Sequence, residues 1–194
     1  IALRIREAAL ELGVKRIVVG ECGHAWRVAY SMWNTLAGIG AGATDPFAKA
    51  LQSQLDPRYR QPMHICELTW DLIERGALTL DRDANDHRVV TFHDSCNVAR
   101  SSGITEEPRR VLGRVCADFR EMVPNRTENY CCTGGGGLLS LPEYRPLRLE
   151  AAKIKAEQLR ATGAKLVCTM CHNCVDGLSD VIKHYKLDMK VVQI

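Results

Sequence analysis

Three apolar, β-branched segments of this chain each run into a cysteine, and this arrangement is the feature that most constrains its fold. Residues 14–21 lead to Cys22, residues 88–94 lead towards Cys96, and residues 164–170 lead to Cys171. Continuous β-branched runs are typical of strands buried in parallel sheets, whose functional sites lie at the carboxyl ends of the strands. The sequence therefore predicts a parallel sheet with thiols gathered at one edge.

Helix-like segments alternate with these strands, which predicts an α/β fold with right-handed crossovers. We expect, in chain order, a helix at 24–36, an irregular segment at 37–62 with one helix at 46–54, a strand–helix unit at 63–76, a helix that begins after Pro108, a strand at 118–124, a helix at 145–163 with Gly163 as its C-cap, a helix at 175–186 and a strand at 190–194.

The two ends of the chain resemble each other. Residues 11–30 and 161–180 both run from a helix end through Gly, a Lys and an apolar strand to a Cys and a helix. An internal repeat explains this most simply, the alternative being chance similarity of two ordinary strand–helix units. The alignment sets Cys22 opposite Cys171, and Ala25 lies opposite Cys174.

We therefore expect two repeated, Rossmann-like parallel βαβ units with a site at the carboxyl edge of their strands. Residues 1–80 are the remainder of a degenerate first repeat, and residues 81–194 are the second repeat. The chain begins without Met and already in a helical pattern, so we expect it to be a fragment of a longer protein.

The composition is that of a globular protein and excludes some partners. Of the 194 residues, 46% are hydrophobic, and 26 basic residues nearly balance 23 acidic ones. This balance favours neither nucleic acid nor an anionic membrane surface as a partner. No apolar run approaches the roughly 20 residues that a membrane-spanning helix needs.

The nine cysteines indicate metal or redox chemistry. Their number is odd, and the chain is long, whereas disulfide frameworks belong to small secreted domains. In the second repeat they fall into three groups, which exceed the four ligands of a tetrahedral zinc site and suit an iron–sulfur cluster. The groups are Cys96, then Cys131 and Cys132, then Cys168, Cys171 and Cys174.

Four glycines, residues 134–137, closely follow the adjacent cysteine pair. Two neighbouring cysteines reach different irons of one cluster more easily than a single tetrahedral ion. Backbone without side chains can approach a cluster closely and direct its N–H groups at inorganic sulfide. We therefore predict that Gly134, Gly135 and Gly136 contact a cluster, the alternative being a flexible loop.

The segments HDSCNVAR, PRRVL, CCTGGGG and GAKLVCTMCHNC resemble the cysteine-rich CCG-domain family of heterodisulfide reductase-like iron–sulfur oxidoreductases. The resemblance covers the second repeat fully and the first from about Cys22. Thr133 departs from the strict Cys-Cys-Gly pattern. Within the family, these segments together with ECGHAWR are most similar to the catalytic iron–sulfur subunit of a membrane complex associated with sulfite reduction.

The resemblance implies a noncubane [4Fe-4S] cluster on five cysteines, and a further pair of [4Fe-4S] clusters in a region upstream of residue 1. The loop length after Cys132 favours the ligand pair Cys168 and Cys171, whereas the repeat favours Cys171 and Cys174. We prefer the second pair. The expected ligands are then Cys96, Cys131, Cys132, Cys171 and Cys174.

Other cysteines have less certain roles in this pattern. Cys22 aligns with Cys171, and His24 lies between the positions that align with Cys171 and Cys174. Their position makes both candidates for a catalytic role, with a substrate thiol, a proton donor or a vestigial site as alternatives. Cys66 and Cys116 are expected to be small core residues, and Cys168 a thiol buried in apolar packing.

Polar residues near the cysteines are expected to support the site. His93, Asp94 and His172 are predicted to be hydrogen bonders around it. Arg100 either neutralises cluster charge or is a solvated helix residue.

The expected function is electron exchange between membrane-derived clusters and the disulfide or trisulfide of a small sulfur-carrier protein. As the resemblance implies, electrons come from quinol through a haem-bearing membrane subunit, and the chain lies in the cytoplasm, attached peripherally to the inner face of the membrane by partner subunits. The alternatives are an iron–sulfur subunit of a lactate or glycolate dehydrogenase-type complex and a zinc-stabilised interaction module.

Overall fold

A four-stranded parallel sheet forms the centre of the molecule. The computed structural model describes residues 2–32, 62–81, 83–85 and 87–194. The strands lie in the order β4-β3-β5-β6, and all neighbours are parallel. Their bounds are β3 Val89–His93, β4 Asp118–Arg120, β5 Leu166–Thr169 and β6 Lys190–Gln193. The predicted α/β class with parallel strands is confirmed.

Helices connect these strands. β3 is followed by α6 (Cys96–Ser102) and α7 (Glu106–Val115), and β5 by α10 (His172–His184). α8 (Arg145–Ala151) and α9 (Lys153–Thr162) precede β5. Short 3₁₀ turns occur in the connections, at η3 Asp83–Asn85, η4 Arg126–Glu128, η5 Leu138–Ser140 and η6 Pro142–Tyr144. None of the helices among the described residues is long and apolar enough to cross a membrane.

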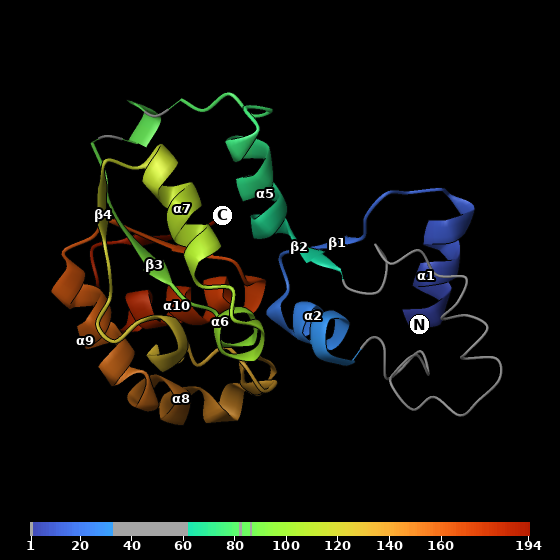
Figure 1. Cartoon of the computed structure of the whole chain (residues 1–194). Coiled ribbons are helices and arrows are strands. Elements are labelled where there is room, and N and C mark those ends of the chain that lie inside the picture. Colours follow the sequence, from blue (N-terminus) through green and yellow to red (C-terminus); the bar gives the residue numbers. More distant parts are fainter. Residues whose placement is uncertain (1, 33–61, 82, 86) are drawn as a thin grey trace.

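Helices lie on both sides of the sheet (Figure 1), and an apolar layer fills the space on each side. On one face, β3 and β5 pack against α6, α7 and α5 (Ile65–Glu74). On the other face, β5 packs against α8, α9 and α10. Along β5, Cys168 belongs to the first layer, whereas Val167 belongs to the second. This alternation follows from the two-residue period of a strand.

A smaller unit from the first part of the chain lies against the carboxyl edge of the sheet. It contains α1 (Ala2–Glu11), α2 (Gly23–Arg27), a π-helical turn η1 (Val28–Met32) and a two-stranded parallel sheet of β1 (Val18–Val19) and β2 (Met63–His64). Trp26 is fully buried, and its indole N–H donates to Ser102 Oγ at 2.7 Å. This contact holds α2 against α6.

The prediction of a buried strand at 14–21 is wrong in its extent and burial. β1 has two residues, and Val18 is 37% exposed. The reason lies in the tertiary structure. In the described part of the chain β1 pairs only with the two-residue β2, so no larger sheet extends or buries it.

Four predicted helices also differ in their bounds, and one of them, expected at 175–186, is α10 with its start at His172. The expected start after Pro108 is wrong, because α7 begins at Glu106, and Pro108 fits in its first turn, where backbone N–H groups need no helical partner. The segment 145–163 is two helices separated at Ala152, with Gly163 as C-cap at φ 65°. The predicted helix at 24–36 becomes α2 and the π turn. Its last residues, and the predicted helix at 46–54, lie outside the described residues.

Candidate metal centre

The thiols of three loops meet at the carboxyl edge of the sheet. Cys96 is the first residue of α6, just after β3, and Cys171 is the N-cap of α10, just after β5. Cys174 lies in the first turn of α10. Cys131 and Cys132 come from the long loop that follows β4. Because the strands are parallel, their carboxyl ends bring these loops together.

Five cysteines form one contiguous group, here called the thiol cluster. Cys132 Sγ and Cys174 Sγ are 3.2 Å apart. The Cys131 thiol donates to Cys132, and the Cys174 thiol donates to Cys171. Cys96, half-buried, is close enough for the charge on Cys132 to act on its pKa. Cys132, Cys171 and Cys174 are buried, whereas Cys131 is exposed to solvent.

Contacts within the thiol cluster distribute its negative charge unevenly. Hydrogen bonds from Cys131 and Cys174 lower the pKa of Cys132. The hydrogen bond with Cys174 lowers the pKa of Cys171 to about 6. The same contacts raise the pKa of Cys131 and of Cys174. Two sulfurs thus favour the thiolate form, which is the form that binds a metal.

Backbone N–H groups point at these sulfurs. Gly23 N–H donates to Cys171 Sγ at 3.4 Å, Thr133 N–H to Cys131 Sγ at 3.2 Å, and Gly134 N–H to Cys132 Sγ at 3.4 Å. Hydrogen bonds of this kind stabilise charge on sulfur and tune a metal that the sulfur binds.

The glycine loop is closely packed at its first residue and open at the others. A Cβ on Gly134 would lie 2.2 Å from Asn173 O, and a Cβ on Gly177 would lie 2.7 Å from Cys132 O. The backbone of the loop therefore touches α10 directly, which only glycine permits at both positions. Gly135 has no such neighbour within 4 Å, and Gly136 is exposed at φ 66° in the following turn.

Four cysteines lie outside the thiol cluster: the half-buried Cys22 and three that belong to the core. Cys66, Cys116 and Cys168 are all buried in the apolar layer formed by α5, α6 and α7. Burial raises the pKa of Cys66 and of Cys168 to about 12. The predicted burial of these three residues in apolar packing is confirmed.

A buried lysine behind the thiol cluster was missed by sequence reasoning. Lys155 is fully buried, and its Nζ donates to Asn129 Oδ1 at 2.7 Å and to Gln158 Oε1. Burial lowers the pKa of Lys155 to about 7, opposed by the charges of Cys132 and Asp94. A signal was present: Lys155 falls on the apolar stripe of Ala152, Ala156 and Leu159, where a charge is unexpected.

Asn129 connects this lysine to His93. Its amide donates to the Asp94 carbonyl and lies 3.4 Å from His93 Nδ1. His93 is buried, which lowers its pKa. A ring nitrogen of His93 and the Sγ atoms of Cys132 and Cys174 all lie within 4.8 Å of one another. His93 therefore sits at the inner side of the thiol cluster, as the sequence predicted for a supporting hydrogen bonder.

Asp94 anchors the long loop instead of facing the thiols. Both of its carboxylate oxygens accept from Arg109 at 2.8 Å, and Arg109 Nε donates to Glu121 at 2.6 Å. Asp94 also accepts the Arg126 backbone N–H at 2.7 Å. This buried network fixes the path between β4 and the adjacent cysteines.

The remaining predicted residues have varied positions. Cys22 is the N-cap of α2, as Cys171 is of α10, and precedes the Gly23 N–H that contacts the thiol cluster. His24 is exposed, with its Nδ1 2.9 Å from Asn173 Nδ2. His172 is exposed and pairs with Asp176.

Arg100 holds the long loop. Its Nε donates to Thr127 O at 2.6 Å, and a second guanidinium nitrogen donates to Asn129 O. Burial raises the pKa of Cys96, and the positive charge of Arg100 opposes this rise. Arg100 is therefore more than a solvated helix residue.

The fold and this donor set define a cysteine-rich metal-binding domain of the parallel α/β type. In agreement, residues 90–178 match the family model of the cysteine-rich CCG domain. The chain is 33% identical over 188 residues to an Hdr-like menaquinol oxidoreductase iron–sulfur subunit of Archaeoglobus profundus, covering 87% of this chain and 34% of that protein.

Other relatives carry related names. Identity is 29% over 217 residues with an Hdr-like menaquinol oxidoreductase iron–sulfur subunit 2 of Archaeoglobus fulgidus, covering 97% of this chain and 37% of that protein. The identity is 27% over 190 residues with one subunit of a dihydromethanophenazine:CoB–CoM heterodisulfide reductase of Methanosarcina mazei, covering 97% of this chain and 41% of that protein. Residues 90–178 are thus a CCG cysteine-rich domain, and the chain is similar to heterodisulfide reductase-like iron–sulfur subunits. It spans about a third of the length of the first two relatives.

Proposed function

We propose that this chain is part of a heterodisulfide reductase-like oxidoreductase and holds a noncubane [4Fe-4S] cluster. Its ligands in this proposal are the five members of the thiol cluster. The observation that carries the proposal is the convergence of these five thiols from three loops, which is more donors than one tetrahedral ion takes. When bound, such a cluster would store and transfer electrons at this edge of the sheet.

The chain's own residues fit that group. The N–H groups of Gly23, Thr133 and Gly134 already point at sulfur atoms. Lys155 offers a buried amine on the inner side, where its hydrogen-bond acceptors are uncharged and where the negative charge of the thiolates favours its protonated form. These groups offset the negative charge of several thiolates in a site where Cys132, Cys171 and Cys174 are buried.

The exposed position of Cys131 sets the side from which a substrate approaches. We propose that the substrate is the disulfide or trisulfide of a small sulfur-carrier protein of the DsrC type, as for the DsrK subunit that the sequence resembles. Reduction of a disulfide takes two electrons and two protons and gives two thiols. In this proposal Cys22 and His24, on the adjoining α2 unit, are the candidates that contact the substrate.

The assembly is proposed from the relatives' names and the resemblance. The Archaeoglobus relatives are named as subunits of menaquinol oxidoreductases. For this chain we propose a haem-bearing membrane subunit as the electron source, a [4Fe-4S] pair upstream of residue 1, and a position at the cytoplasmic face of the membrane.

Metal analysis of the full-length protein, purified without oxygen, tests the cluster. We expect iron and acid-labile sulfide in equal amounts, an EPR signal, and reduction of a DsrC-type trisulfide by the dye-reduced protein. If iron and sulfide are present but no trisulfide is reduced, the proposed cluster is supported and the proposed substrate is refuted.

The described group of His93, Cys132 and Cys174 favours one competing function, a zinc-stabilised interaction module. Its three ligand atoms lie within 4.8 Å of one another, and zinc binds both side-chain types. A colourless protein that contains zinc and no iron would establish this alternative.

A further inference from the structure

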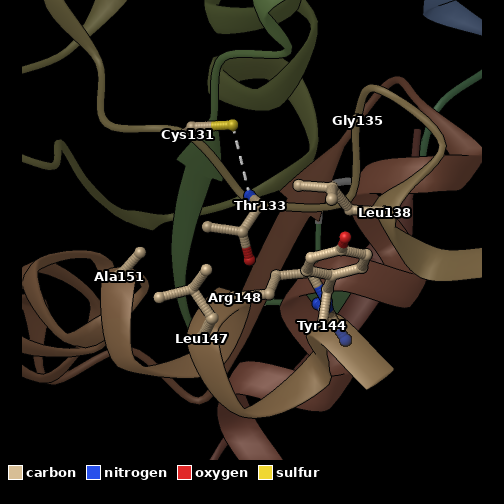
Figure 2. A pocket seen from close by; sticks show the side chains of 8 residues that line it. All are labelled: Cys131, Thr133, Gly135, Leu138, Tyr144, Leu147, Arg148 and Ala151. Atoms are coloured by element: carbon tan, nitrogen blue, oxygen red, sulfur yellow. Dashed lines mark hydrogen bonds between the residues drawn. The ribbon is translucent and has the colours of Figure 1, made fainter. Parts of the chain in front are cut away.

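A pocket of about 330 Å³ opens beside the exposed sulfur of Cys131 (Figure 2). One wall comes from the cysteine–glycine loop, and the other from η5, η6 and α8. Its lining residues are Cys131, Thr133, Gly135, Leu138, Tyr144, Leu147, Arg148 and Ala151. The N–H of Thr133 that donates to Cys131 forms the border between the thiol cluster and this pocket.

Arg148 borders this pocket, and two of its buried hydrogen-bond donors, just beneath the apolar lining, have no acceptor. Its side chain is 2% exposed, and its Nη2 pairs with Asp180. Its Nε and Nη1 are buried without a partner. Leaving buried donors of a charged group unpaired is costly, which indicates that an acceptor completes them.

The charge around Arg148 is positive. Asp180 is shared with a second guanidinium, that of Arg145, at 3.2 Å. One carboxylate therefore serves two cations, and one positive charge is left over. An acceptor that enters here is favoured if it is an anion.

Thr133 adds a strained backbone and a second orphaned polar atom. Its φ is 60°, in the left-handed region that β-branched residues rarely adopt. Its Oγ1 is buried and has no hydrogen-bond partner. Figure 2 shows the Thr133 side chain directed into the pocket, towards the side of Arg148. A glycine would avoid the strain, so the hydroxyl is the part of Thr133 that a ligand would use.

The rest of the pocket is apolar and accessible. Leu138 is 38% exposed, Tyr144 47% and Leu147 64%. Exposed large apolar side chains gathered around a pocket are typical of a surface that binds an apolar ligand. A ligand that fits therefore combines an aliphatic part with one anionic acceptor.

From these contacts we propose that the pocket binds an aliphatic carboxylate that is covalently attached to the reacting sulfur. The carboxylate accepts from Arg148 and Thr133, the aliphatic part lies against Leu138 and Leu147, and the sulfur lies at the Cys131 end. This inference rests on the proposed function for the identity of the sulfur compound. The carboxylate belongs either to a small thiol acid or to a peptide segment of a protein substrate.

Binding of matched probes to the full-length, cluster-loaded protein tests the inference. The probes are 4-mercaptobutanoate and its neutral amide, 4-mercaptobutanamide, with affinities measured by anaerobic calorimetry. We expect the carboxylate to bind about 10-fold to 100-fold more tightly, as a charged hydrogen bond provides. Arg148→Met should abolish this ratio, and Thr133→Val should reduce it. Equal affinities in the unaltered protein would overturn the inference.

A surface variant keeps the test independent of folding. Leu147→Glu places a negative charge at an exposed position of the pocket wall and should lower the affinity for the carboxylate probe alone. The matched control is Ile154→Glu, at a position 47% exposed on α9 outside the lining. A carboxylate preference that survives both Leu147→Glu and Arg148→Met would place the probe elsewhere and refute the proposal.

Two further experiments distinguish a small thiol acid from a peptide as the source of the carboxylate, and the pocket assignment from the proposed function. A Cys-containing peptide is compared with a free and an amidated C-terminal carboxylate. Preference for the free form identifies a peptide source, and preference shown by the small acid alone identifies a thiol acid. If the protein binds the carboxylate selectively but reduces no disulfide, the pocket assignment stands and the proposed function is refuted. If it reduces a disulfide but shows no carboxylate selectivity, the proposed function stands and the pocket assignment is refuted.

Discussion

Replacing Cys174 or Cys168 with alanine tests which CxxC pair belongs to the thiol cluster. Both sulfurs are buried, at 3% and 5% exposure, so both substitutions remove one packed sulfur and should cost about 1 kcal/mol of unfolding free energy. Their surroundings differ. Cys174 Sγ lies 3.2 Å from Cys132 Sγ, whereas Cys168 lies on the opposite face of β5. Equal stability loss with unequal iron content is therefore expected.

The chemistry of the two thiols reinforces this expectation. Burial raises the pKa of Cys168 to about 12, so it stays protonated at neutral pH and is a poor ligand. Cys174→Ala should lose the EPR signal, and Cys168→Ala should retain iron, sulfide and spectrum. Urea unfolding of both variants in metal-free form checks that the stability costs match, because a bound cluster would itself stabilise the variant that keeps it. Iron kept by Cys174→Ala and lost by Cys168→Ala would refute the assignment and restore the 168/171 pair.

Three further predictions follow from the site. Cys131→Ser and Cys132→Ser should each abolish or convert the cluster, with the double variant hardly worse, because ligands of one cluster act as a unit. Gly134→Ala should lose iron, since its Cβ would lie 2.2 Å from a carbonyl oxygen of α10, whereas Gly135→Ala should keep it. Lys155→Met should alter the pH dependence of stability in metal-free protein. Because burial lowers the pKa of Lys155 from 10.5 to about 7, the unfolded chain binds one more proton between these values. Between these pH values the free energy of unfolding should therefore increase with pH, by at most about 1.4 kcal/mol per pH unit. This increase should be absent in Lys155→Met.

Each of these three has an outcome that contradicts it. Full iron and sulfide in both single cysteine variants would remove the adjacent pair from the site. Equal iron in the two glycine variants would mean that the contact with α10 is not needed. An unchanged pH slope in Lys155→Met, or the same change in the exposed control Lys153→Met, would show that Lys155 is not the group responsible.

The sequence alone determined the α/β class and the groups of cysteines. Apolar runs followed by Cys96 and Cys171 predicted strands that end at a common edge, and the sheet has them there. Local pattern suffices for this, because a parallel strand buried on both faces needs a continuous apolar run. The burial of Cys168 could also be predicted, since it lies within the strand and not at its tip.

Strand length and helix continuity could not be predicted from local pattern. The β-branched run at 14–21 has the propensity of a long strand but finds only Met63 and His64 as partners in the described part of the chain. A strand forms only where another strand supplies hydrogen bonds, and that depends on distant residues. The break at Ala152 is likewise not marked by a Gly or Pro.

The polar groups around the thiols were decided by tertiary structure. Lys155 comes from a helix, Asn129 from a loop and His93 from a strand end, and no spacing in the sequence links them. The unpaired donors of Arg148 and the left-handed backbone of Thr133 are equally invisible in the sequence. Side-chain type sets which chemistry a residue offers, whereas burial and partners, which only the folded chain supplies, set its charge and what it can bind.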